Sequence, residues 1–392
     1  MEDNEESEFE KEKFLKFELK VCHEAKLQEL LRNITSTELK LCSDASKEFI
    51  KLLKGDSGGE LLRQYIQTSS KCSELLQAWK VRQGKPGLSY ILSLISTILC
   101  HPDGKYSHDD LKGVGMSRDL DKFARLIVNE NLGDLYKELN SKEAKRQNAV
   151  LSLLASVVRR GSGLASDVAK NFDFKLTIFP KLAECKHKRT EVKRKHSTRK
   201  SFVSFAMSFL EVGKPGLLRW VLQQKEMYSG VFRGLANDED EIVIYVLSTL
   251  RDRVLTPESL VPPGLRSVLF GSVTLDQLIC ISGRENGGIA AEIAHSVLVM
   301  VCTDSSNGLM PDLKRHPDPL RGNPKRLLGL MKKLKSTEVD YHRDLLLDIA
   351  SGRPSLGSAY LDEFPYNLED LASPSWSHLP LAVQMCRILS NA

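Results

Sequence analysis

A chain of 392 residues, of which 41% are hydrophobic and 27% charged, is long enough to bury a sizeable core and is typical of a folded protein, not a disordered one. The net charge of +5 is small but unevenly distributed, which points to electrostatic partners or targeting more than to a small neutral substrate. The eight cysteines form no CxxC pair and no set with zinc-ligand spacing, so we expect a reduced, intracellular, soluble protein with neither a metal site nor a cofactor.

The chain begins with an acidic head, residues 1–8, for which we predict no folded structure. Residues 1–13 carry seven acids and two lysines and lack an apolar stretch, so they do not form a signal peptide. The longest mostly apolar run, 88–100, contains Ser and Thr and is too short to span a bilayer. No membrane partner is therefore expected.

Helical periodicity covers most of residues 9–350, and we predict one α-helical repeat domain over that range. Apolar positions recur at helical spacing in four clear segments: 88–99, 141–160, 242–255 and 288–302. Pro86 suits a first helical turn, and Gly161 suits a helix end. The residues 268–275 could pass for a strand, but no partner strand follows. The pattern predicts an all-α fold.

Four helices share a local pattern around Ser93, Ser152, Ser208 and Ser248, which lie 59, 56 and 40 residues apart. Spacings of about 40–60 residues fit helical pairs with insertions, as in armadillo or HEAT repeats. We therefore predict an armadillo/HEAT-like helical solenoid with irregular repeats. A non-repeating helical bundle is the alternative.

A basic loop is predicted at 185–198, where eight Lys or Arg residues within 186–200 are opposed by Glu191 alone. A helix follows, with phenylalanines at 202, 205 and 209. Their spacing of i, i+3 and i+7 is typical of a buried helix face and does not indicate a platform on which bases stack. The basic side chains could bind phosphate, direct nuclear import, or form a solvated loop without either function. The candidate RNA-binding or localisation residues are Lys186, Lys188, Arg189, Lys193, Arg194, Lys195, Arg199 and Lys200.

A Pro-rich loop is predicted at 304–324, and it overlaps a second basic stretch, 312–335, with a net charge of +6. The candidate residues of this second basic patch are Lys314, Arg315, Arg321, Lys325, Arg326, Lys332, Lys333 and Lys335. Residues 351–392 form a loop-rich tract followed by one terminal helix, which is what the start of a further, truncated array would look like.

Residues 55–59 spell Gly-Asp-Ser-Gly-Gly, the nucleophile signature of chymotrypsin-like proteases. That chemistry needs a histidine base and an aspartate, both earlier in the sequence and held by a double β-barrel, and only His23 lies upstream. We interpret the pentapeptide as an interhelical turn that can adopt positive φ. The adjacent pairs Cys22-His23 and Cys100-His101 cannot converge on one metal ion. No catalytic residue is assigned, and a hydrolase using Ser57 is disfavoured.

Several segments, in this order, resemble the N-terminal region of the Npa/Urb family of nucleolar pre-ribosomal-associated proteins, and a plant member most closely. They are 146–158, Asp167-Val168, 171–173, 199–210 and 246–250, and the resemblance spans residues 60–350.

This resemblance implies an armadillo-like solenoid in the nucleus and nucleolus that acts as a non-enzymatic scaffold in early 60S ribosomal subunit biogenesis. Pre-ribosomal RNA or snoRNA and ribosome assembly proteins would be its partners, with no small-molecule substrate. Family members are much longer, so only an N-terminal portion is represented. The basic loop is not expected in every member, and RNA contact there is inferred from its charge alone. The alternative is a helical-repeat protein–protein adaptor without RNA binding, whose basic loop serves only nuclear import.

Overall fold

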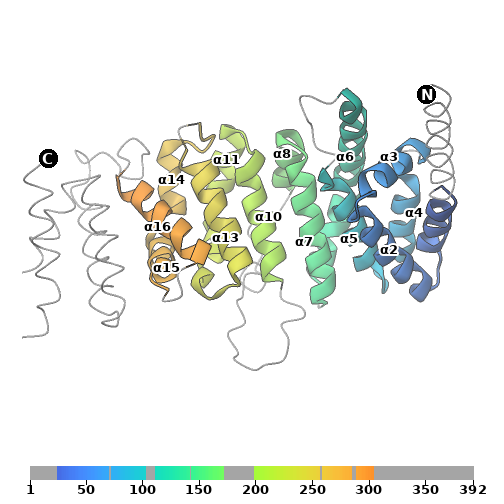
Figure 1. Cartoon of the computed structure of the whole chain (residues 1–392), viewed down its shortest axis with the longest axis horizontal. Coiled ribbons are helices and arrows are strands. Elements are labelled where there is room, and N and C mark those ends of the chain that lie inside the picture. Colours follow the sequence, from blue (N-terminus) through green and yellow to red (C-terminus); the bar gives the residue numbers. More distant parts are fainter. Residues whose placement is uncertain are drawn as a thin grey trace, which may run out of the picture. The chain divides into compact units, whose positions relative to one another are not determined.

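The structure is a computed structural model that describes residues 24–69, 72–102, 111–141, 143–171, 198–256, 258–284 and 288–303. Within these ranges the secondary structure is helical and contains no β-strand, which confirms the all-α prediction (Figure 1). The acidic head, residues 185–197 of the basic loop, the Pro-rich loop and the tract 351–392 lie outside the described residues. The chain divides into two compact units, Met1–Asp173 with Glu191–Ser208, and Phe174–Thr190 with Phe209–Ala392.

In the first unit, successive helices pack in two rows (Figure 1). One row contains α2, α5 and α7, each packed against the next, and α7 is hydrogen-bonded to the start of α10. The other row contains α3, α6 and α8. Helices that each contact mainly their neighbours are the arrangement of a helical solenoid. The bounds are α2 Leu39–Leu53, α3 Gly58–Thr68, α4 Ser73–Arg82, α5 Leu88–Leu99, α6 Leu111–Leu139, α7 Ala144–Arg159, α8 Ser162–Asn171 and α10 Arg199–Val212, of which residues up to Ser208 belong here.

Helix α5 matches the predicted segment 88–99, and α7 lies within the predicted segment 141–160 but starts later. Helix α5 begins at Leu88, not at Pro86, because Gly87 precedes it with φ +96°, a left-handed conformation that favours glycine. Helix α7 begins at Ala144, and its residues from Ala149 to Val158 are buried except for Ser152. The two helices pack face to face, so the centre of this unit lies along them.

In the second unit, α16 packs on both α13 and α15, α14 packs on α11, and α15 packs on α12. The bounds are α11 Pro215–Leu222, α12 Lys225–Phe232, α13 Asp240–Thr249, α14 Pro263–Leu269, α15 Ser272–Ser282 and α16 Gly288–Thr303. The predicted helix over 242–255 is confirmed, but its last turn, Leu250–Val254, is a π-helix. Residues 268–275 are the end of α14 and the start of α15, and not a strand.

The phenylalanine ridge is structural, as its spacing predicted. The side chains of Phe202, Phe205 and Phe209 are all fully buried. Burial of each such side chain contributes about 2–3 kcal/mol to folding, which is why a ridge of this kind marks a core helix.

Candidate functional site

Most of the predicted basic residues lie outside the described part of the chain. This applies to six members of the first set and to every member of the second patch, so their roles stay predictions. Only Arg199 and Lys200 are described, in the first turn of α10, and Lys200 is exposed.

Arg199 is buried, with 2% of its surface exposed, and this does not fit the predicted phosphate contact. A buried guanidinium is stable only when it is paired within the protein, so it is not presented to a ligand. Its register explains the burial, because Arg199 precedes Phe202 by three residues and shares its helix face. The spacing of three residues is present in the sequence, but Arg199 also belongs to the basic run, and the charge of that run suggests exposure. Arg199 is therefore removed from the candidate set.

The Gly-Asp-Ser-Gly-Gly segment is an interhelical turn, as predicted, between the end of α2 and the start of α3. The prediction of a positive φ for its glycines is wrong, since Gly55, Gly58 and Gly59 all have negative φ. Gly58 instead allows the backbone of the turn to pass close to the backbone of Leu53. A Cβ atom placed there would lie 2.1 Å from the carbonyl oxygen of Leu53.

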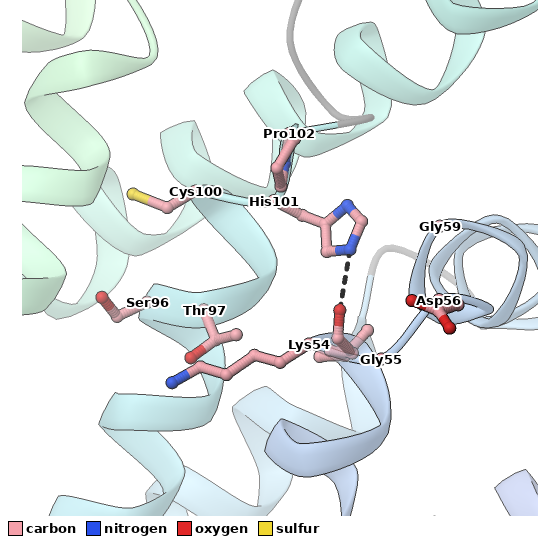
Figure 2. A pocket seen from close by; sticks show the side chains of 10 residues that line it. Lys54, Gly55, Asp56, Gly59, Ser96, Thr97, Cys100, His101 and Pro102 are labelled. Carbon is pink, nitrogen blue, oxygen red and sulfur yellow. Dashed lines mark hydrogen bonds between the residues drawn. The ribbon is translucent and has the colours of Figure 1, made fainter.

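A cavity of about 580 Å³ opens beside this turn (Figure 2). Its walls come from the end of α2, the turn itself and the last residues of α5. The side chain of Lys54 extends toward Ser96 and Thr97, whereas Asp56 lies on the other side of His101. The cavity therefore offers a positive charge with two hydroxyl groups in one part and a negative charge in another.

The histidine that borders the cavity is held by the backbone. Its Nε2 lies 3.0 Å from the carbonyl oxygen of Leu53, which can only accept, so Nε2 carries the hydrogen (Figure 2). Ser57 is not among the residues that line the cavity, and no nucleophile–base pair involving Ser57 is seen in the described chain. The hydrolase hypothesis thus finds no support in this geometry.

The Cys100-His101 pair diverges, as expected for neighbouring residues. The Cys100 thiol donates to Ser156 Oγ at 3.1 Å, and the His101 ring points to the end of α2. Within the described ranges, no group of three or more His, Cys, Asp or Glu residues is placed to hold a metal ion. In the same ranges, none of the helices combines the length and the hydropathy that a bilayer crossing requires.

A line of serine contacts that the sequence did not reveal crosses the first row of helices. Ser96 and Ser156 join α5 to α7 with hydroxyl oxygens 2.7 Å apart. Ser152 donates to Ser201 Oγ at 3.3 Å, joining α7 to α10. Arg159 reinforces that second junction by donating to Ser204 Oγ at 3.0 Å. The sequence showed recurring serines, but only the packing shows which of them meet.

Comparison with known proteins gives one family and two curated relatives. A family model described as "Ribosome 60S biogenesis N-terminal" (Npa1) matches residues 72–379. Nucleolar pre-ribosomal-associated protein 1 of Homo sapiens is 22% identical over 337 residues, which cover 81% of this chain and 14% of that protein. The Mus musculus protein of the same name is 21% identical over 338 residues, with the same coverage. The match thus spans 14% of the length of these relatives.

Two crystal structures of engineered proteins also align with the chain. Each is 13% identical, with TM-scores of 0.31 and 0.34, and they cover 93% and 83% of this chain and 99% and 97% of their own. A similarity at this level supports no conclusion about function.

Proposed function

The chain belongs to the Npa1 family, described as the N-terminal region of 60S ribosome biogenesis proteins, and on this premise we propose that it acts in the assembly of the large ribosomal subunit. The observation that carries the proposal is the family match over residues 72–379, most of the chain. It confirms the family predicted from the sequence segments; the resemblance to a plant member stays a prediction.

The proposed role is that of a non-enzymatic scaffold in the nucleolus. Two rows of packed helices provide extended faces on which other proteins can dock, which is how solenoid proteins commonly bind their partners. The name of the human and mouse relatives describes them as nucleolar and pre-ribosomal-associated. Because the match covers only 14% of these relatives, their whole set of partners is not transferred to this chain.

The proposed partners are ribosome assembly proteins and pre-ribosomal RNA or snoRNA. The basic loop at 185–198 and the second basic patch supply the positive charge for RNA contact. Contacts of lysine and arginine with phosphates position a protein on RNA without reading its sequence.

The role in large-subunit assembly is tested by affinity purification of the tagged protein from its native cells. Precursors of the large-subunit rRNA should be enriched over precursors of the small-subunit rRNA, measured by northern blotting. Depletion of the protein should also cause large-subunit precursors to accumulate. Equal recovery of both classes of precursor, or of neither, would contradict the proposal.

The basic loop is tested by replacing Lys193, Arg194 and Lys195 with Ala. If the loop binds single-stranded RNA, the slope of log K against log salt should become shallower by about 0.7 for each phosphate that the variant no longer neutralises. Unchanged RNA affinity together with loss of nuclear import would instead favour the protein–protein adaptor. Unchanged affinity and unchanged import would leave the loop with neither role.

A further inference from the structure

Charge is distributed unequally between the two helix rows of the first unit. The first row consists of α2, α5, α7 and α10 up to Ser208. In this row α2 has three basic and two acidic residues, and α5 has no charged residue. Helices α7 and α10 together have five basic residues and no acidic residue. The row α3, α6 and α8 carries seven basic and seven acidic residues. Among these helices, the excess of positive charge therefore lies on one row.

Lysines form a stripe along α2, at the border with α5. Lys47 and Lys51 lie on α2, and Lys54 is the residue directly after its end. Their spacing of i, i+4 and i+7 places them on one side of the helix, and all three are exposed. The Nζ atom of Lys47 lies 5.0 Å from the centre of the Tyr90 ring on α5. Lys54 lines the cavity together with Thr97, and Thr97 lies on α5 as Tyr90 does (Figure 2).

These lysines are available to a ligand. Lys47 is 3.4 Å from Asp44, but an exposed pair of this kind contributes little. The other acid of α2, Glu48, is paired with Lys26 at 2.9 Å. Among the described residues, neither Lys51 nor Lys54 has an acidic partner. The three lysines are therefore exposed along one side of the helix.

Helix α5 adds an uncharged, hydrogen-bonding strip beside this stripe. Five side chains of α5 are half-exposed, and each is a serine, a threonine or a tyrosine. The cysteine directly after the helix is half-exposed as well. The six residues are Ser89, Tyr90, Ser93, Ser96, Thr97 and Cys100. Beyond them, Lys145 on α7 and Lys200 on α10 are again exposed.

We propose that the face formed by Lys47, Lys51, Lys54, Tyr90, Ser93 and Thr97, here called the lysine–hydroxyl face, binds the sugar–phosphate backbone of single-stranded RNA. The inference rests on the proposed function and adds a further RNA contact, separate from the basic loop and from the second basic patch. Lysines neutralise phosphates, while hydroxyl groups exchange hydrogen bonds with phosphate oxygens and 2′-hydroxyls.

An acidic peptide fits this face less well. Peptides that dock on helical surfaces use large apolar anchor residues, which need apolar contacts on the receptor. In the described part of the first unit, the exposed large apolar side chains are Leu39 and Leu41, at the far end of α2 from Lys54. The six residues of the face supply hydroxyl groups and charge instead.

The proposal is tested by fluorescence anisotropy with a fluorescein-labelled 20-nucleotide polyuridine and the full chain, over a series of salt concentrations. The variant K47Q/K51Q/K54Q should weaken binding by about tenfold or more and should reduce the slope of log K against log salt by about 2, because three phosphates are no longer neutralised. The control K122Q/K137Q/K170Q removes the same charge from exposed positions on α6 and α8. It should change the slope by less than about 0.7.

Folding is checked separately, by requiring that the thermal unfolding of both triple variants match that of the unmodified protein. Equal losses of RNA affinity in the two triple variants would show a general charge effect and would contradict RNA binding by the lysine–hydroxyl face. An unchanged slope in K47Q/K51Q/K54Q would overturn it too, as would equal displacement of the RNA by polyglutamate of the same length. If the unmodified protein still enriches large-subunit precursors in these cases, only the face is wrong. If it enriches none, the proposed function fails.

Discussion

Gly58 lies where the chain turns from α2 into α3, and its lack of a side chain lets the backbone pass against Leu53. The whole Gly-Asp-Ser-Gly-Gly segment looked like a catalytic signature in the sequence, yet this glycine is required by distance, since a Cβ atom would lie 2.1 Å from a carbonyl oxygen. Backbone atoms cannot move aside as a flexible side chain can. The segment is thus explained by packing at the scale of one residue.

Replacement of Gly58 by Ala should destabilise the protein by about 2 kcal/mol or more, because the chain must shift to relieve the contact. Gly133→Ala is the matched control. Gly133 lies within α6 with nothing within 4 Å of its missing Cβ, so alanine there should stabilise by up to about 1 kcal/mol. Urea denaturation of both variants measures the difference, and equal effects would contradict the steric explanation.

Two buried thiols should be unreactive in the folded protein. Burial raises the pKa of Cys72 to about 12 and also raises that of Cys42, so at pH 8 neither forms much thiolate, the reactive species. Cys280 is exposed. We expect a maleimide at pH 8 to label Cys280 within minutes, and Cys42 and Cys72 only after urea is added. Peptide mass mapping reads the order, and rapid labelling of Cys72 without urea would show that it is not buried.

At the scale of helices, the contact between α5 and α7 depends on small polar residues. Ser156 is 2% exposed, faces Ser96 across the interface and donates to the backbone oxygen of Ser152 at 2.8 Å. A small side chain lets two helices approach closely, and its hydroxyl group keeps its hydrogen bonds when buried. Apolar side chains from both helices fill the rest of the contact.

Ser156→Leu should therefore destabilise by about 2–4 kcal/mol, from overpacking and the removal of buried hydrogen bonds. Ser156→Ala should cost about 1 kcal/mol, since only the hydrogen bonds are removed. The control is Ser166→Ala on α8, because Ser166 is half-buried and, in the described part of the chain, its hydroxyl donates within its own helix, to the backbone oxygen of Ser162. Its free energy of unfolding should change by less than about 0.5 kcal/mol. Denaturant midpoints rank the three variants. If Ser156→Leu left the free energy of unfolding unchanged, the interface between α5 and α7 would not be tightly packed.

These elements show what the sequence could and could not predict. Helices α5, α7, α13 and α16 follow from the spacing of apolar residues, because that spacing reflects one buried face per helix. The contact of Ser96 with Ser156 depends on how two helices are offset, which no local pattern encodes. The burial of Arg199 follows from its register on α10, three residues before Phe202, and its charge gives no sign of that register.

At the scale of the molecule, the chain divides into two compact units built on the same principle of helices packed on their neighbours. Stability in such proteins is close to a sum of local terms and nearest-neighbour interfaces. The lysine–hydroxyl face lies wholly in the first unit. A change that loosens the second unit should therefore leave the face folded.

The locality of stability is tested by two matched core substitutions. Leu154→Ala on α7 and Leu247→Ala on α13 each remove a fully buried side chain and should cost about 2–5 kcal/mol. Because α7 packs on α5, α6 and α8, the first substitution should speed amide hydrogen exchange in those helices more than in α15 and α16. The second should speed exchange in α16, which packs on α13, more than in α5 and α6. Mass spectrometry of exchanged peptides measures both. A uniform rise along the whole chain in either variant would mean that the two units unfold as one cooperative body and would overturn the nearest-neighbour description.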